Sequence, residues 1–144
     1  MNRIIGFNFT EISAQRKKPQ EGKIEINVNI DIESITSEKI DLVKDPDQEA
    51  LKFDFKFTVS YKPELANIVL RGTVLSMINK EKSKEIIKKW KSKKIEEDTK
   101  IPLFNFILTK CNLRALQLEE ELNLPTHVPL PRIQPEKSDT AYTG

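Results

Sequence analysis

Two stretches of the chain alternate apolar and polar residues with a period of two. In the first, isoleucine or valine fills every even position from 24 to 32, and the odd positions hold Glu25, Asn27, Asn29, Asp31 and Glu33. The second runs from Leu51 to Tyr61, with Phe53, Phe55 and Phe57 on its apolar side. Successive side chains of a strand point to opposite faces, so both stretches predict strands with one buried face.

Two more stretches show the same alternation. Arg3 to Thr10 places Ile5, Phe7 and Phe9 on one side, and Ala66 to Ile78 contains Gly72, which predicts a bulge or a close backbone approach. Polar segments with proline or glycine separate the strands, and no helical pattern lies between them. The sequence therefore predicts a four-stranded antiparallel meander rather than parallel strands with crossover helices.

After Asn79 the apolar residues follow a helical period instead. A lysine-rich helix is expected over residues 80–94, and a long C-terminal helix is expected to run to about Leu122. Acidic residues at 96–98 suit the second helix's N-terminus, with Thr99 as its cap and Pro102 in its first turn. Asn123 can adopt the left-handed conformation that ends a helix. The predicted fold class is α+β, a sheet packed against a long helix.

The long helix carries apolar residues on two sides. At about 100° per residue, one side covers the sheet with Phe104, Ile107, Leu108, Cys111, Ala115, Leu118 and Leu122. The opposite side presents Phe106, Thr109, Leu113 and Leu116. Leaving such residues in water is costly, so we expect a second copy of the chain to cover them. Alternatively, the lysine-rich helix or the proline-rich segment after Leu122 folds over them.

Composition argues against most catalytic sites. Cys111 and His127 are the chain's only cysteine and histidine. The chain therefore has too few of these side chains for a zinc site or for a catalytic site that pairs a nucleophile with a histidine. We interpret Cys111 as a small core residue, His127 as a residue of the surface or of the proline-rich segment, and Glu119, Glu120 and Glu121 as a solvated helix rim. With only four glycines there is no phosphate-binding loop. The sequence thus predicts no enzyme activity, catalytic residue, metal or cofactor.

Net charge and targeting patterns also limit the partners. The formal charge of +2 lacks the strong basic bias of a dedicated nucleic-acid binder. The eight lysines of the 80–94 helix still leave an alternative function, RNA or ribosome binding through that helix. No apolar run is long enough to span a membrane, and residues 1–8 do not have a signal-peptide pattern. We therefore expect a cytoplasmic location.

Residues 1–133 are expected to form one domain, and residues 134–144 a disordered tail with nothing to bury. The order of four strands, a polar helix, a long helix and a proline-rich crossover resembles the SecB family of export and antifolding chaperones. Ile101-Pro102-Leu103-Phe104-Asn105-Phe106-Ile107-Leu108 looks like the family's long helix. Leu122-Asn123-Leu124-Pro125-Thr126-His127-Val128-Pro129-Leu130-Pro131 looks like its crossover loop.

This resemblance implies a homo-oligomer, a dimer or a dimer of dimers, that holds unfolded polypeptide clients in apolar grooves without ATP. It places the long helix at the oligomer interface, in agreement with the stripe at Phe106, Leu113 and Leu116. An acidic outer sheet surface would dock a translocation motor, a role for Glu25, Asp31 and Glu33. A ribosome partner is a further possibility. Along the groove, the expected client contacts are Tyr61, Leu122, Leu124, Val128, Leu130 and Ile133.

Overall fold

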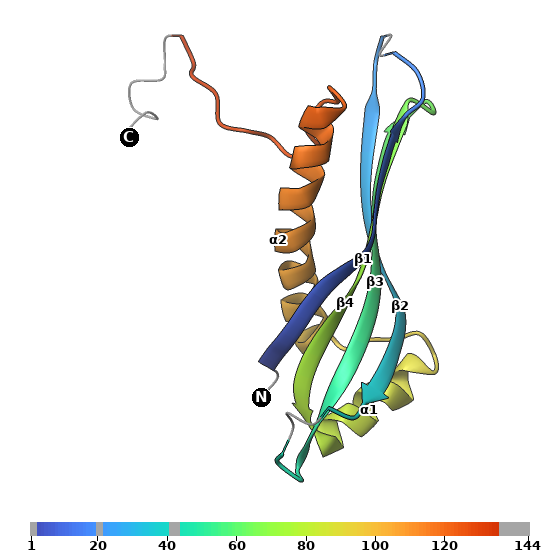
Figure 1. Cartoon of the computed structure of the whole chain (residues 1–144), viewed down its shortest axis with the longest axis vertical. Helices are drawn as coiled ribbons and strands as arrows, with labels where there is room; N and C mark the ends of the chain where they lie inside the picture. The colour runs from blue at the N-terminus through green and yellow to red at the C-terminus, as the bar shows by residue number, and fades with distance from the viewer. Residues whose placement is uncertain (1–2, 20–21, 41–43, 136–144) are drawn as a thin grey trace.

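The computed structural model describes residues 3–19, 22–40 and 44–135. Four strands are followed by two helices. The strands are β1 (Arg3–Arg16), β2 (Glu25–Glu38), β3 (Gln48–Lys62) and β4 (Ala66–Asn79), and the helices are α1 (Lys80–Trp90) and α2 (Glu97–Glu121). All strand pairs are antiparallel. The predicted α+β class, a four-stranded antiparallel sheet with a long C-terminal helix, is confirmed (Figure 1).

The strand order is β1-β4-β3-β2, which differs from a simple meander in one link. β2, β3 and β4 follow one another, but β1 pairs with β4 instead of β2. The connection after β1 therefore passes the end of the β3–β4 hairpin. It is held there because the backbone N–H groups of Lys17 and Lys18 both donate to the Leu65 carbonyl, at 2.7 and 3.3 Å.

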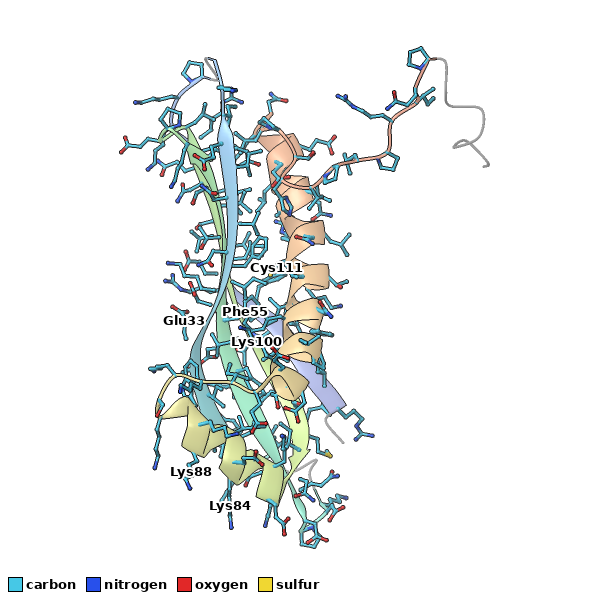
Figure 2. The ribbon with its side chains drawn as sticks, turned by 180° about the vertical axis from the view of Figure 1, so that it is seen from behind. Glu33, Phe55, Lys84, Lys88, Lys100 and Cys111 are labelled. Carbon is cyan, nitrogen blue, oxygen red and sulfur yellow. The ribbon has the colours of Figure 1, made fainter. Side chains whose placement is uncertain are left out.

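The core lies on one face of the sheet. Odd-numbered residues of β3 from 51 to 61 are buried, and the register places even-numbered residues of β4 beside them. Both helices join this cluster, α1 through Ile86 and α2 through Leu103, Ile107, Cys111, Ala115 and Leu118. In Figure 2, Phe55 and Cys111 lie between the sheet and α2. The other sheet face is polar, and Arg71 on it pairs with Glu11 at 2.6 Å and Glu33 at 3.2 Å.

Gly72 marks a close approach, as its sequence position predicted. A Cβ atom there would lie 2.5 Å from the Asn8 carbonyl oxygen of β1 and 2.6 Å from the Phe55 ring. The register of β1 against β4 shifts beside this contact, between Phe9 and Glu11. A glycine is required here because no side chain fits between the neighbouring strand and the ring.

Several element ends differ from the prediction. β1 continues to Arg16 and β2 to Glu38, so both strands extend into segments whose alternation is weaker. Helix α2 begins at Glu97, after Glu96, whose side chain makes no capping hydrogen bond. Thr99 therefore lies inside the first turn and is not the cap, and Pro102 lies further inside the helix than predicted. Asn123 does take the left-handed conformation, with φ of 53°.

Candidate functional site

A crevice of about 320 Å³ opens between β2, the end of α1 and the first turns of α2. Its apolar lining comes from three places: Ile30 and Ile32 of β2, Trp90 and Ile95 at the α1–α2 connection, and Phe104 of α2. All five are only half-buried although they pack against the core. The crevice is thus an uncovered margin of the core.

Charged groups border the apolar walls. The Lys93 ammonium lies 4.5 Å from the centroid of the Trp90 ring, and that of Lys100 lies 5.3 Å from the Phe104 ring. Asp31 contributes a carboxylate from β2. Ammonium groups over aromatic faces are attracted by the ring quadrupole, so both lysines are held beside the opening without filling it.

β2 adds a further property, because it is an edge strand. Among the described strands it pairs only with β3, so its second edge presents backbone N–H and C=O groups that none of these strands uses. Such an edge accepts an extended peptide through main-chain hydrogen bonds, and adjacent apolar pockets then take its side chains. The crevice beside Ile30 and Ile32 provides both features together.

The segment after α2 is anchored by a buried polar network. The His127 side chain is 1% exposed and that of Glu119 is fully buried, with 2.6 Å between the ring Nδ1 and the carboxylate. The His127 backbone N–H also donates to Glu119, at 3.1 Å, and the ring Nε2 lies 2.8 Å from Asn112 Oδ1. Glu119 is therefore not a solvated rim residue. His127 lies in the proline-rich segment, as one of its two interpretations had it, but its side chain is not at the surface, because it and Glu119 satisfy each other inside the fold.

Tyr61 belongs to the same anchor. Its hydroxyl donates to the Pro125 carbonyl at 2.6 Å, and its side chain is 1% exposed. Burial, and then the neighbouring Glu119 carboxylate, raise the pKa of Tyr61 above its ordinary value, so the hydroxyl keeps its proton. Tyr61 fixes the start of the segment and presents no surface to a ligand in this conformation.

The other predicted client contacts differ in how far their side chains are exposed. Leu124 is buried, Leu122 and Val128 are half-buried, and Leu130 and Ile133 are exposed. None of them lines the crevice at β2. Client binding at these six residues stays a prediction.

The residues of the predicted oligomer stripe on α2 also differ in exposure. Phe106 packs edge-on against Phe7 of β1, with ring centroids 5.6 Å apart, so it has a partner within the chain. Leu116 is half-buried, whereas Thr109 and Leu113 are exposed, Leu113 by 63%. Helix α1 packs at the sheet with Ile86 in the core. Leu113 is therefore the large apolar group that the stripe still presents.

The two charged surfaces proposed from sequence have separate positions. Glu25, Asp31 and Glu33 are all exposed on β2, and Figure 2 shows Glu33 on the side of the sheet away from α2. On α1, Lys84 and Lys88 point away from the body of the molecule (Figure 2). Lys82 and Lys89 pair with Asp98 and Glu96, which neutralises part of the lysine excess. Motor docking and RNA binding stay predictions.

Cys111 is fully buried, and burial raises the pKa of its thiol to about 12. At neutral pH it is a protonated core side chain, as its helix position indicated. Over residues 3–19, 22–40 and 44–135, no group of three or more His, Cys, Asp or Glu side chains is arranged to hold a metal. Within the same residues, neither helix has the length and apolar character needed to cross a bilayer.

No protein-family model and no curated protein matches this chain. Among solved structures, it is similar to the SecB-like chaperone Rv1957 of Mycobacterium tuberculosis, solved in complex with a ChAD peptide from the Rv1956 HigA1 antitoxin. The likeness covers 93% of this chain and 92% of that chain, with a TM-score of 0.52 and 12% sequence identity. At that identity the likeness concerns the fold: this chain has a distant SecB-like fold.

Proposed function

We propose that this protein is an ATP-independent holding chaperone that binds unfolded polypeptide segments as a homo-oligomer, with the crevice beside β2 as a contact site. The observation that carries the proposal is the combination of apolar walls at Trp90 and Phe104 with an unpaired strand edge. Main-chain hydrogen bonds do not depend on client sequence, and an open apolar crevice tolerates many side chains. The likeness in fold to a chaperone solved with a peptide also supports it.

This proposal moves the groove from the place that the sequence suggested. The start of the proline-rich segment is held by Tyr61, Glu119 and Asn112, so it is fixed to the fold rather than open to a client. A single crevice contact is weak, because burying one client side chain contributes roughly 1.5–3 kcal/mol before ordering costs. Several crevices in one oligomer would raise the affinity for a long client through effective concentration.

Suppression of aggregation is the test of client holding. Near-stoichiometric protein should prevent a denatured test protein from aggregating in buffer without nucleotide. Replacing both Ile30 and Ile32 by threonine should remove most of this effect, because the crevice loses two apolar walls while β2 keeps β-branched residues. The matched control is Val28→Thr, since Val28 lies on the same face of β2, is 42% exposed and does not line the crevice.

Two results would contradict the proposal. One is unchanged aggregation in the presence of the wild-type protein. The other is equal loss of suppression in Val28→Thr and the double variant, because general weakening of β2 would then explain it. Circular dichroism at the assay temperature should show that all variants remain folded.

Self-association is tested at Leu113, the most exposed apolar group of the predicted stripe. Leu113→Glu should lower the mass in light scattering to that of a smaller species, because a carboxylate would then have to be desolvated at the interface. Ile101→Glu is the control: Ile101 is 54% exposed on the same helix, but it lies more than three turns along the helix from Leu113 and about 120° around its axis. An unchanged mass for Leu113→Glu would rule out this face as the interface.

A further inference from the structure

The chain leaves the fold after its His127 anchor as an extended arm, Val128–Pro135. Residues 129–135 are all exposed, with Leu130 exposed by 53% and Ile133 by 73%. Figure 1 shows the arm projecting from α2 without returning to the body of the molecule. Its base is nevertheless rigidly placed, because both ring nitrogens of His127 have partners on α2. An apolar arm presented from a fixed point needs a surface to cover it.

The positions of the prolines suit this arm to one kind of surface. The prolines of the arm stand at 129, 131 and 135, all odd-numbered. In an extended strand, the N–H and C=O of successive residues point to opposite edges. Every proline of the arm therefore faces one edge, and the opposite edge keeps an unbroken row of donors at the even residues Leu130, Arg132 and Gln134. Proline is tolerated in an edge strand with this placement.

The edge of β2 matches the arm in charge and in apolar surface. Arg132 is the arm's only charged residue, whereas β2 carries Glu25, Asp31 and Glu33 on its outer face. The arm can run along β2 in either of two directions, and successive side chains of a strand point to opposite faces. In one of these directions, Pro129, Pro131 and Ile133 lie over the crevice and Arg132 lies on that acidic face. Aromatic walls such as Trp90 and Phe104 are suitable contacts for proline rings.

The direction of the arm indicates whose crevice it meets. In both views, the arm leaves α2 on the side away from β2 (Figure 1, Figure 2). To reach its own crevice it would have to turn back across the helix. We propose that, until a client displaces it, the arm of one copy adds as a strand to the β2 edge of a second copy and covers the crevice there. A reciprocal exchange between two copies would close into a symmetric dimer.

Trp90 gives a direct readout, because it is the chain's only tryptophan and lines the crevice. If the arm of a second copy covers Trp90, dilution of the full-length protein should shift its fluorescence emission to longer wavelength as the arm dissociates. Leu130→Pro should weaken this association at least about tenfold, because it removes a donor from the paired edge. Ile133→Pro is the matched control, since it places a proline on the outward edge and should cost less than about threefold.

Three outcomes would overturn the proposal. The first is fluorescence emission that does not depend on protein concentration, and the second is an equal effect of the two proline variants. The third is a change in emission by Leu130→Pro that is the same at every concentration, because it would show that the arm binds to its own chain. Both substitutions replace exposed residues, so both variants should fold as the wild type does. The measurement uses no client. It therefore separates failure of the arm exchange from failure of the proposed chaperone activity.

Discussion

Replacing Gly72 by alanine is expected to lower the free energy of unfolding by about 3 kcal/mol, the upper part of the range for overpacking. The new Cβ atom would meet the Asn8 carbonyl oxygen at 2.5 Å and two atoms of the Phe55 ring at 2.6 and 2.8 Å. Neither neighbour can move freely. Asn8 belongs to the backbone of a paired strand, and Phe55 is fully buried beneath α2. Urea denaturation followed by circular dichroism measures the loss.

Gly6 provides the matched control for Gly72. It lies in β1, and a Cβ there would contact only the flexible side chain of Leu75, at 3.3 Å. Gly6→Ala should therefore change stability by less than about 1 kcal/mol, because a leucine side chain can shift and alanine is better than glycine in a strand. If Gly72→Ala is as mild as Gly6→Ala, β1 and β4 are not packed as closely as described.

Removing the Glu119 carboxylate should also cost about 3 kcal/mol. Glu119→Ala leaves two buried His127 donors without acceptors, the backbone N–H and the group at ring Nδ1. Each unsatisfied buried group costs about 1–3 kcal/mol. Thermal or urea unfolding measures the effect, and release of the segment that follows α2 should accompany it as increased proteolysis near His127.

Glu120→Ala is the control, since Glu120 is the next residue of the same helix and is exposed. It should change stability by less than about 0.5 kcal/mol. The double variant Glu119→Leu with His127→Leu should recover only part of the loss, because it removes the unpaired ring group but leaves the backbone N–H of residue 127 without its acceptor. If Glu119→Ala and Glu120→Ala behave alike, the buried network does not hold the segment.

Periodicity predicted the strands and helices well, because it reports which face of each element is buried. The alternation from Ile24 to Ile32 and from Leu51 to Tyr61 corresponds to β2 and β3. It did not predict that β1 pairs with β4, since alternation defines a face and not a neighbour. Polar loops between strands suggested a meander, but the connection after Arg16 is long enough to pass a whole hairpin.

The buried network and the crevice were missed for different reasons. Glu119 stands in a run of three glutamates, and its charge suggested solvent. Its spacing from Cys111 and Ala115, eight and four residues, nevertheless placed it on the core face of α2. The crevice had no comparable signal, because Ile30, Trp90 and Phe104 each resemble ordinary core residues. Only their meeting at the β2 edge of the sheet leaves them uncovered.

The pairing of β1 with β4 has a consequence for the order of folding during synthesis. Phe7 pairs with Val74, so β1 leaves the ribosome long before its partner has been made. The β2–β3 and β3–β4 pairs join strands that are neighbours in the sequence, whereas β2 and β3 both lie between β1 and β4, so the three later strands can form a sheet with lower loop-closure cost. The N-terminal strand, with Phe7 and Phe9, then stays without its partner until β4 is complete. We therefore expect its addition to the three-stranded sheet to be the last step in assembling the sheet.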